Sequence, residues 1–159
     1  MERVDKILKH PTFIYELAKI NELEKERRYC RHSIIHLLDV ARISYIFNLE
    51  ENGGLAKDII YGTALLHDIG KGIQYEDGTP HNISSANLAK DILLDCGYTD
   101  VESKQMLEAI LLHRKPVETT NYLAQILYRA DKKSRACYSC VACEDCHWEP
   151  TKKNLSLDY

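Results

Sequence analysis

The segment TALLHDIGKG (residues 63–72) places two polar residues directly after an apolar run. Its first half is typical of a buried helix, and His67 and Asp68 follow Leu66 without a break. Removing a carboxylate from water beside an imidazole is costly unless something compensates. The rest of the sequence must therefore supply that compensation.

Helical periodicity extends on both sides of this segment. Apolar residues recur three or four positions apart through long stretches, and alternating strand-like patterns are essentially absent. Turn-forming residues are dense in GKGIQYEDGTP (residues 70–80), which is expected to be a loop. The predicted fold class is all-α, a bundle of about six to seven helices, with segments expected over residues 13–23, 31–47, 55–69, 82–97, 101–113 and 121–137.

The composition changes after about Ala136. Residues 137–159 show little helical periodicity and contain four cysteines spaced three apart. We expect residues 1–136 to form one metal-binding helical domain. Residues 137–159 are expected to be a short Cys-rich tail packed on that domain and not a second domain.

Overall composition is that of an ordinary globular protein. The 159 residues are 45% hydrophobic and 28% charged, with a formal net charge of -3. This balance gives no reason to expect duplex nucleic acid or an anionic membrane as the main partner. The charged start MERVDKILKHPTF does not resemble a signal peptide, and no apolar segment is long enough to span a bilayer. We expect a cytoplasmic protein with reduced cysteines.

Histidines and aspartates recur inside helices or at their ends. A bundle that turned these side chains inward would gather imidazoles and carboxylates in one pocket, as metal-binding bundles do. Such a donor set suits divalent iron, manganese, nickel or zinc, and the metal charge would compensate for burying Asp68. Taken singly, each histidine is more often a plain core or surface residue, and Asp131 could simply pair with Arg135. The candidates are His36, His67, Asp68, His81, His113 and Asp131.

Three short motifs that contain these candidates resemble the metal-binding motifs of the HD superfamily of metal-dependent phosphohydrolases. They are HLLDVAR (36–42), LLHDIGK (65–71) and YRADK (128–132). The resemblance implies an HD-domain helical bundle in which His36, His67, Asp68 and Asp131 bind one metal.

Two further segments resemble those of binuclear HD enzymes. PHNISSANLAKDIL (80–93) supplies His81, and LEAILLHRK (107–115) supplies His113. The resemblance then implies six ligands shared by two metals with Asp68 bridging, whereas a mononuclear enzyme would need only four. The pattern is nearest to the symmetrical dinucleoside tetraphosphate hydrolase branch, but it departs from that branch at Arg114 and at KKSRAC (132–137).

The same resemblance implies catalysis by a metal-activated water. Asp68 would bridge the metals and could take a proton. Lys71, expected one helical turn after His67, would neutralise charge on the phosphoryl oxygens. The candidates for substrate binding are His32, Arg114, Lys132 and Arg135. The three cations could instead be solvated surface residues, and His32, one helical turn before His36, could instead be a ligand.

The cysteines of CYSCVACEDC (137–146) leave three interpretations open. Cys137, Cys140, Cys143 and Cys146 could be free thiols, could wrap a structural zinc, or could hold an iron–sulfur cluster. The remaining two cysteines, Cys30 and Cys96, are expected to be core residues.

The sequence therefore predicts a metal-dependent phosphohydrolase acting on a small nucleotide-like substrate. One alternative is a non-catalytic module that binds a metal and a nucleotide for regulation. Another is a redox or metal sensor in which the Cys tail controls the bundle.

Overall fold

The computed structural model describes residues 1–116 and 118–159, and within these ranges it contains helices and no strand. The all-α prediction is therefore confirmed. The tail adds the short 3-10 helices η1 (Cys137–Ser139) and η2 (Pro150–Lys152). The α-helices are α1 (Glu2–Lys9), α2 (Pro11–Leu23), α3 (Ile34–Glu50), α4 (Lys57–Leu66), α5 (Lys71–Asp77), α6 (His81–Asp95), α7 (Asp100–Leu112) and α8 (Tyr122–Lys133).

Two of these helices, α1 and α5, lie outside the predicted segments. The loop expected over residues 70–80 is wrong where α5 forms. At seven residues α5 is too short to be stable alone, and it packs against α2 and α6. It ends at Gly78, whose φ of 83° is a left-handed conformation that favours glycine.

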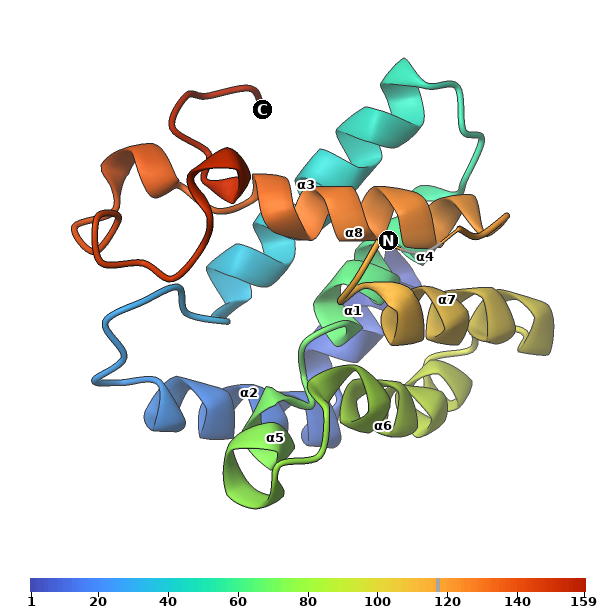
Figure 1. Cartoon of the computed structure of the whole chain (residues 1–159). Helices are drawn as coiled ribbons and strands as arrows, with labels where there is room; N and C mark the ends of the chain where they lie inside the picture. Colours follow the sequence, from blue (N-terminus) through green and yellow to red (C-terminus); the bar gives the residue numbers. More distant parts are fainter. Residues whose placement is uncertain (117) are drawn as a thin grey trace.

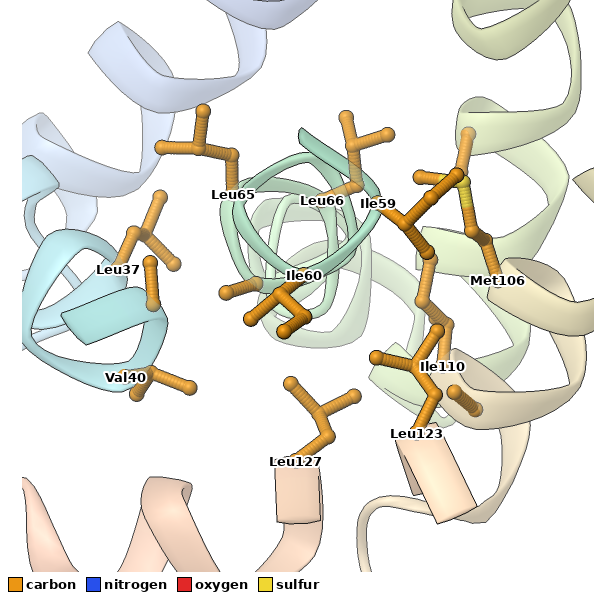
Figure 2. Close-up of a cluster of buried hydrophobic side chains, with 14 of the residues drawn as sticks. Leu37, Val40, Ile59, Ile60, Leu65, Leu66, Met106, Ile110, Leu123 and Leu127 are labelled. Atoms are coloured by element: carbon orange, nitrogen blue, oxygen red, sulfur yellow. The ribbon is translucent and has the colours of Figure 1, made fainter. Parts of the chain in front are cut away.

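The hydrophobic core surrounds α4. Figure 2 shows side chains from α3, α7 and α8 converging on this helix. Burying each such side chain contributes roughly 1.5–3 kcal/mol to the stability of the fold. Contacts with these neighbouring helices therefore fix the position of α4. Its C-terminal end, where His67 and Asp68 follow, is thereby held in the middle of the bundle. The labelled core residues are Leu37, Val40, Ile59, Ile60, Leu65, Leu66, Met106, Ile110, Leu123 and Leu127.

The turn after α4 is locked against α6 through Gly70. Its backbone N–H donates to Ser85 Oγ at 2.9 Å, and Ser84 Oγ donates to its carbonyl at 3.1 Å. A Cβ atom at Gly70 would lie 2.4 Å from the Ser85 backbone nitrogen, so only glycine fits this approach. The glycine therefore brings Asp68 and the start of α6 together.

The tail lies beyond the end of α8, near the start of α3 (Figure 1). Asn154 Nδ2 fastens it there, donating to the carbonyls of Lys132 at 2.7 Å and Arg135 at 2.9 Å. Of the helices in the described residues, none has both the length and the apolar character that a bilayer crossing needs.

Arg3 ties α1 to α4 and α7. Its guanidinium donates to both carboxylate oxygens of Glu102 at 2.7 and 3.0 Å and to Asp58 at 2.8 Å. The bond from Arg3, helped by the backbone of Thr99, lowers the pKa of Glu102 to about 2. Because this is below the ordinary value of 4.5, the ionised carboxylate stabilises the fold at neutral pH, and this contribution is lost as the pH falls from about 4.5 to about 2.

Glu102→Gln is therefore expected to lower the free energy of unfolding by about 1 kcal/mol at about pH 7 and by much less at about pH 3. Urea denaturation at the two pH values measures the difference. Glu2→Gln, which changes an exposed carboxylate of α1, is the control. An equal loss at both pH values would show that the ionised Glu102 contributes no stability.

Candidate metal centre

Five helices bring the six predicted ligands to one place. His36 lies in the first turn of α3, and His67 and Asp68 directly follow α4. His81 opens α6, His113 follows α7, and Asp131 lies in the last turn of α8. None of the six is more than 7% exposed. Most of the set therefore consists of buried helix ends that meet at the middle of the bundle.

The first group of donors is His36, His67, Asp68 and Asp131. Their ligand atoms all lie within 4.8 Å of one another. Asp131 Oδ1 is 3.4 Å from His36 Nε2 and 3.8 Å from His67 Nε2. Asp68 Oδ2 is 3.6 Å and 3.3 Å from the same two nitrogens. Two imidazoles and two carboxylates therefore face a common centre.

The second group shares Asp68 with the first. Its other oxygen, Oδ1, is 3.3 Å from His81 Nε2 and 3.5 Å from His113 Nε2. The ligand atoms of these three residues also lie within 4.8 Å of one another. Asp68 thus directs one oxygen to each group, which is the arrangement of a carboxylate that bridges two metal ions.

All four imidazoles present Nε2 to the centre because Nδ1 is occupied elsewhere. An N–H at Nδ1 that donates to an outside acceptor leaves the Nε2 lone pair to face the centre, which is the usual support for a histidine ligand. At His36 this lone pair accepts from Arg135 Nη2 at 3.1 Å. The acceptors are Ser134 Oγ for His36 (3.1 Å), Ala64 O for His67 (2.6 Å), Gln74 Oε1 for His81 (2.5 Å) and Ile110 O for His113 (2.6 Å).

Buried atoms without hydrogen-bond partners show that this donor set fits metal ions. His67 Nε2, Asp68 Oδ1 and Asp131 Oδ1 are buried and unpartnered. The Nε2 atoms of His81 and His113 lie 3.1 Å apart with both lone pairs facing inward. Unpaired buried acceptors of this kind are costly unless a cation binds them. Imidazole nitrogen and carboxylate oxygen suit divalent first-row metals.

The electrostatics of the centre are dominated by its two carboxylates. Burial lowers the pKa of His67, but the charges and hydrogen bonds of Asp68 and Asp131 outweigh it and raise that pKa to about 9. Burial raises the pKa of Asp68, but the surrounding imidazoles, His67 foremost, hold it well below the ordinary value. The ionised carboxylates therefore make the centre attractive to cations.

Lys71 lies beside the metal centre, but on a different helix from the one predicted. The prediction that it continues the helix of His67 is wrong, because α4 ends at Leu66 and Lys71 begins α5 after a turn. Its side chain still lines the cavity of about 220 Å³ that borders the metal centre. Burial lowers the pKa of Lys71, and the charges of Asp68 and Asp131 oppose that effect.

The other predicted cations also line this cavity. Lys132 pairs with Asp131, and Arg114 follows His113. Arg135 is buried, with Nη2 at 3.1 Å from His36 Nε2 and 3.6 Å from Asp131 Oδ1. The structure therefore gathers Lys71, Arg114, Lys132 and Arg135 around one cavity.

His32 is buried in the cavity wall and belongs to a polar chain that the sequence did not reveal. Its Nδ1 donates to Glu24 Oε1 at 2.5 Å, and its backbone N–H donates to Glu24 Oε2 at 2.6 Å. Tyr75 donates to the same carboxylate at 2.5 Å. His32 Nε2 then lies 3.7 Å from Asp68 Oδ2, so Glu24 orients a further imidazole toward the centre.

Glu24→Ala is expected to destabilise the fold by about 2–3 kcal/mol, because the two buried donors of His32 and the partly exposed hydroxyl of Tyr75 lose their acceptor. Urea denaturation measures this loss, and Glu26→Ala, an exposed neighbour, is the matched control. A loss no larger than that of the control would show that the chain through Glu24 is not a stabilising unit.

The tail contributes the remaining part of the cavity wall. Cys146, His147 and Trp148 line the same cavity as Lys71 and Asp68. Nothing in the periodicity of the sequence indicates this, because the tail has no regular element that would show which surface it packs against.

Comparisons with known proteins identify relatives of this chain. A Clostridium beijerinckii protein with the name "Uncharacterized protein" is 46% identical over 159 residues, which is 100% of both chains. Ribonuclease Y of Acetivibrio thermocellus is 29% identical over 127 residues. That match covers 80% of this chain and only 22% of the ribonuclease.

A solved structure shows the same fold. It is the crystal structure of a predicted HD superfamily hydrolase from an uncultured Thermotogales bacterium, with a TM-score of 0.63 and 23% identity. The match covers 91% of this chain and 83% of that chain. The profile of the HD domain family matches residues 33–136, a range that includes all six residues of the metal centre. The chain therefore belongs to the HD domain family.

Proposed function

We propose that this protein is a metal-dependent phosphohydrolase that cleaves a phosphoester or phosphoanhydride of a nucleotide-like substrate. The observation that carries the proposal is the position of Asp68, which directs one carboxylate oxygen to each of two donor groups. Cationic side chains line the cavity beside that carboxylate. Two adjacent cation sites facing further positive charge suit an anionic phosphoryl group.

Two divalent ions would be held by the six ligands, with Asp68 between them. When bound, such ions supply a water of lowered pKa and polarise a phosphoryl oxygen. The roles of the protein are orientation and charge. Lys71, Arg114, Lys132 and Arg135 would neutralise the phosphoryl oxygens. His32, with Nδ1 fixed by Glu24, would hold or release a proton at Nε2 toward the cavity.

The surroundings of the cavity support a nucleotide-like substrate. A groove of about 1090 Å³ adjoins it, since Arg114, Lys132, His147 and Trp148 line both. Tyr128 also lines this groove. Aromatic side chains stack on bases and cationic ones bind phosphates, so the groove suits a molecule that has both.

A specific observation favours a second candidate substrate, single-stranded RNA. Ribonuclease Y is similar to this chain over 127 residues. The same aromatic and basic groove suits several linked nucleotides as well as one.

Purified protein supplied with Mn²⁺, or with Fe²⁺ under anaerobic conditions, tests the proposal. It is assayed against nucleoside mono-, di- and triphosphates, dinucleoside tetraphosphates and labelled single-stranded RNA. We expect metal-dependent hydrolysis of a mononucleotide or dinucleotide, and none by a His67→Ala variant purified in parallel. Cleavage of RNA alone would select the second candidate. No hydrolysis by protein that contains its metals would favour the non-catalytic binding module.

A further inference from the structure

Five of the six cysteines surround one cavity next to the metal centre, and this cavity shares Arg135, Cys30 and Cys146 with the metal-centre cavity. The cavity has a volume of about 270 Å³, and its cysteines are half-buried free thiols: Cys30, Cys137, Cys140, Cys143 and Cys146. The expectation that Cys30 is a core residue is wrong, because it lies in the segment before α3 and faces the tail. Cys96 is buried in the bundle as expected.

Short turns of the tail direct its thiols to one side. The N–H of Cys140 donates to the carbonyl of Cys137 at 3.2 Å, and the N–H of Cys143 donates to that of Cys140 at 3.1 Å. Lys153 Nζ then donates to the Cys143 carbonyl at 2.6 Å. A repeated three-residue turn brings residues three apart to the same side, which the spacing of the cysteines matches.

Cys30 interacts with three of the tail thiols. Burial raises the pKa of Cys30, Arg135 lowers it, and the charges of Cys137, Cys140 and Cys146 raise it further. Cys143 lines the same cavity, so all four tail thiols lie around the space that Cys30 faces. Thiolates this close repel one another unless cations lie between them. The cavity between them provides the space for such cations.

The spacing of the sulfurs argues against a single zinc ion. Zinc holds four thiolates at about 2.3 Å, so their sulfurs lie within roughly 4 Å of one another. In the described residues, no three cysteine sulfurs lie within 4.8 Å of one another, whereas both donor groups of the metal centre do. In an iron–sulfur cluster the thiolates bind different iron atoms of a larger core and stand farther apart.

We propose that Cys30 and three of the four tail cysteines (Cys137, Cys140, Cys143 and Cys146) ligate a [4Fe–4S] cluster in this cavity. One ligand comes from the bundle and three come from the tail, so the cluster would fasten the tail to the segment before α3. The four thiols lose their protons on binding. Arg31, Arg135 and Lys153 line the cavity and offset the negative charge of the ligated cluster.

A cluster at this site would also position residues that line the metal-centre cavity. Cys146 directly precedes His147 and Trp148, and all three residues line the metal-centre cavity. Arg135 lines both cavities. Ligation of Cys146 would therefore fix the position of the two aromatic residues that follow it.

Anaerobic purification of the full chain, followed by measurement of acid-labile sulfide, tests the proposal. Sulfide is counted because iron alone could occupy the metal centre. We expect about four sulfides per chain and the broad visible absorption of a cluster. Protein that contains zinc and no sulfide after reconstitution with iron and sulfide would overturn the proposal. This measurement needs no variant, so it does not depend on how well a variant folds.

Variants then test the choice of ligands. Cys30→Ser is expected to lose most of the sulfide, and so are three of the four tail variants Cys137→Ser, Cys140→Ser, Cys143→Ser and Cys146→Ser. Cys96→Ser, a buried cysteine of the bundle, is expected to retain it and serves as the matched control. Circular dichroism checks that each variant remains helical. Full sulfide content in a folded Cys30→Ser protein would overturn the assignment, as would full sulfide content in more than one of the folded tail variants.

Discussion

Asp68→Asn is expected to remove metal from both donor groups and to lower turnover by at least about a thousandfold. The substitution keeps the shape of the side chain but removes the charge that both groups share. Losing one charge-stabilising group in a catalytic site commonly costs about a hundredfold to a thousandfold in rate. Here two ion sites lose a charged ligand together, so the expected loss of turnover is at or beyond the upper end of this range. Elemental analysis and steady-state kinetics of the purified variant measure the two effects.

Asp91→Asn, an exposed carboxylate on α6, is the matched control and should change neither quantity. A second comparison separates bridging from simple ligation. His81→Ala should reduce the metal content to about one ion per chain, because it affects only the second group. If Asp68→Asn also leaves one tightly bound ion per chain, Asp68 serves a single site and the bridging assignment is wrong.

Lys71→Met is expected to lower kcat by about a hundredfold to a thousandfold while the metal content stays unchanged. Methionine keeps the apolar stem of the side chain and removes the ammonium that lines the cavity. If the ammonium stabilises charge that grows in the transition state, kcat should fall more than apparent substrate affinity. Kinetics on the best substrate found, with metal analysis of the same samples, provide the measurement.

Lys90→Met, an exposed lysine on α6, provides the comparison for Lys71. It should retain parental kinetics. If Lys71→Met also keeps the kcat of the parent protein, charge neutralisation must be assigned to Lys132, Arg135 or Arg114 instead. A fall in metal content in Lys71→Met would instead show that this residue acts on the ligands and not on the substrate.

The elements of the bundle that form the core were predictable because their apolar residues repeat with the helical period. The sequence did not reveal α5, whose seven residues include Gly72 and have no long apolar stripe. Gly72 is buried against the stem of Lys19 on α2, so here a glycine lies inside a helix and does not mark a loop. Tertiary contacts decided the conformation at that position.

The convergence of His36, His67, Asp68 and Asp131 followed from ordered motifs, since each motif stands at a characteristic place on a helix. Glu24 carried no such signal, because it lies in a charged run that is typical of a solvated surface. It is buried only because His32 and Tyr75 fold over it. Cys30 was misassigned for a similar reason: its partners lie more than a hundred positions away.

The distribution of the metal ligands along the chain has a consequence for biosynthesis. The ligands extend along the chain from His36 to Asp131, and the five helices that position them must be in place before the donors meet. A nascent chain that has not yet exposed α8 lacks Asp131, one carboxylate of the first group, so the ion of that group would bind only after most of the chain has been translated. Ion capture would then be a late checkpoint on the finished fold, and an ion that binds only the folded state raises resistance to unfolding as its concentration rises.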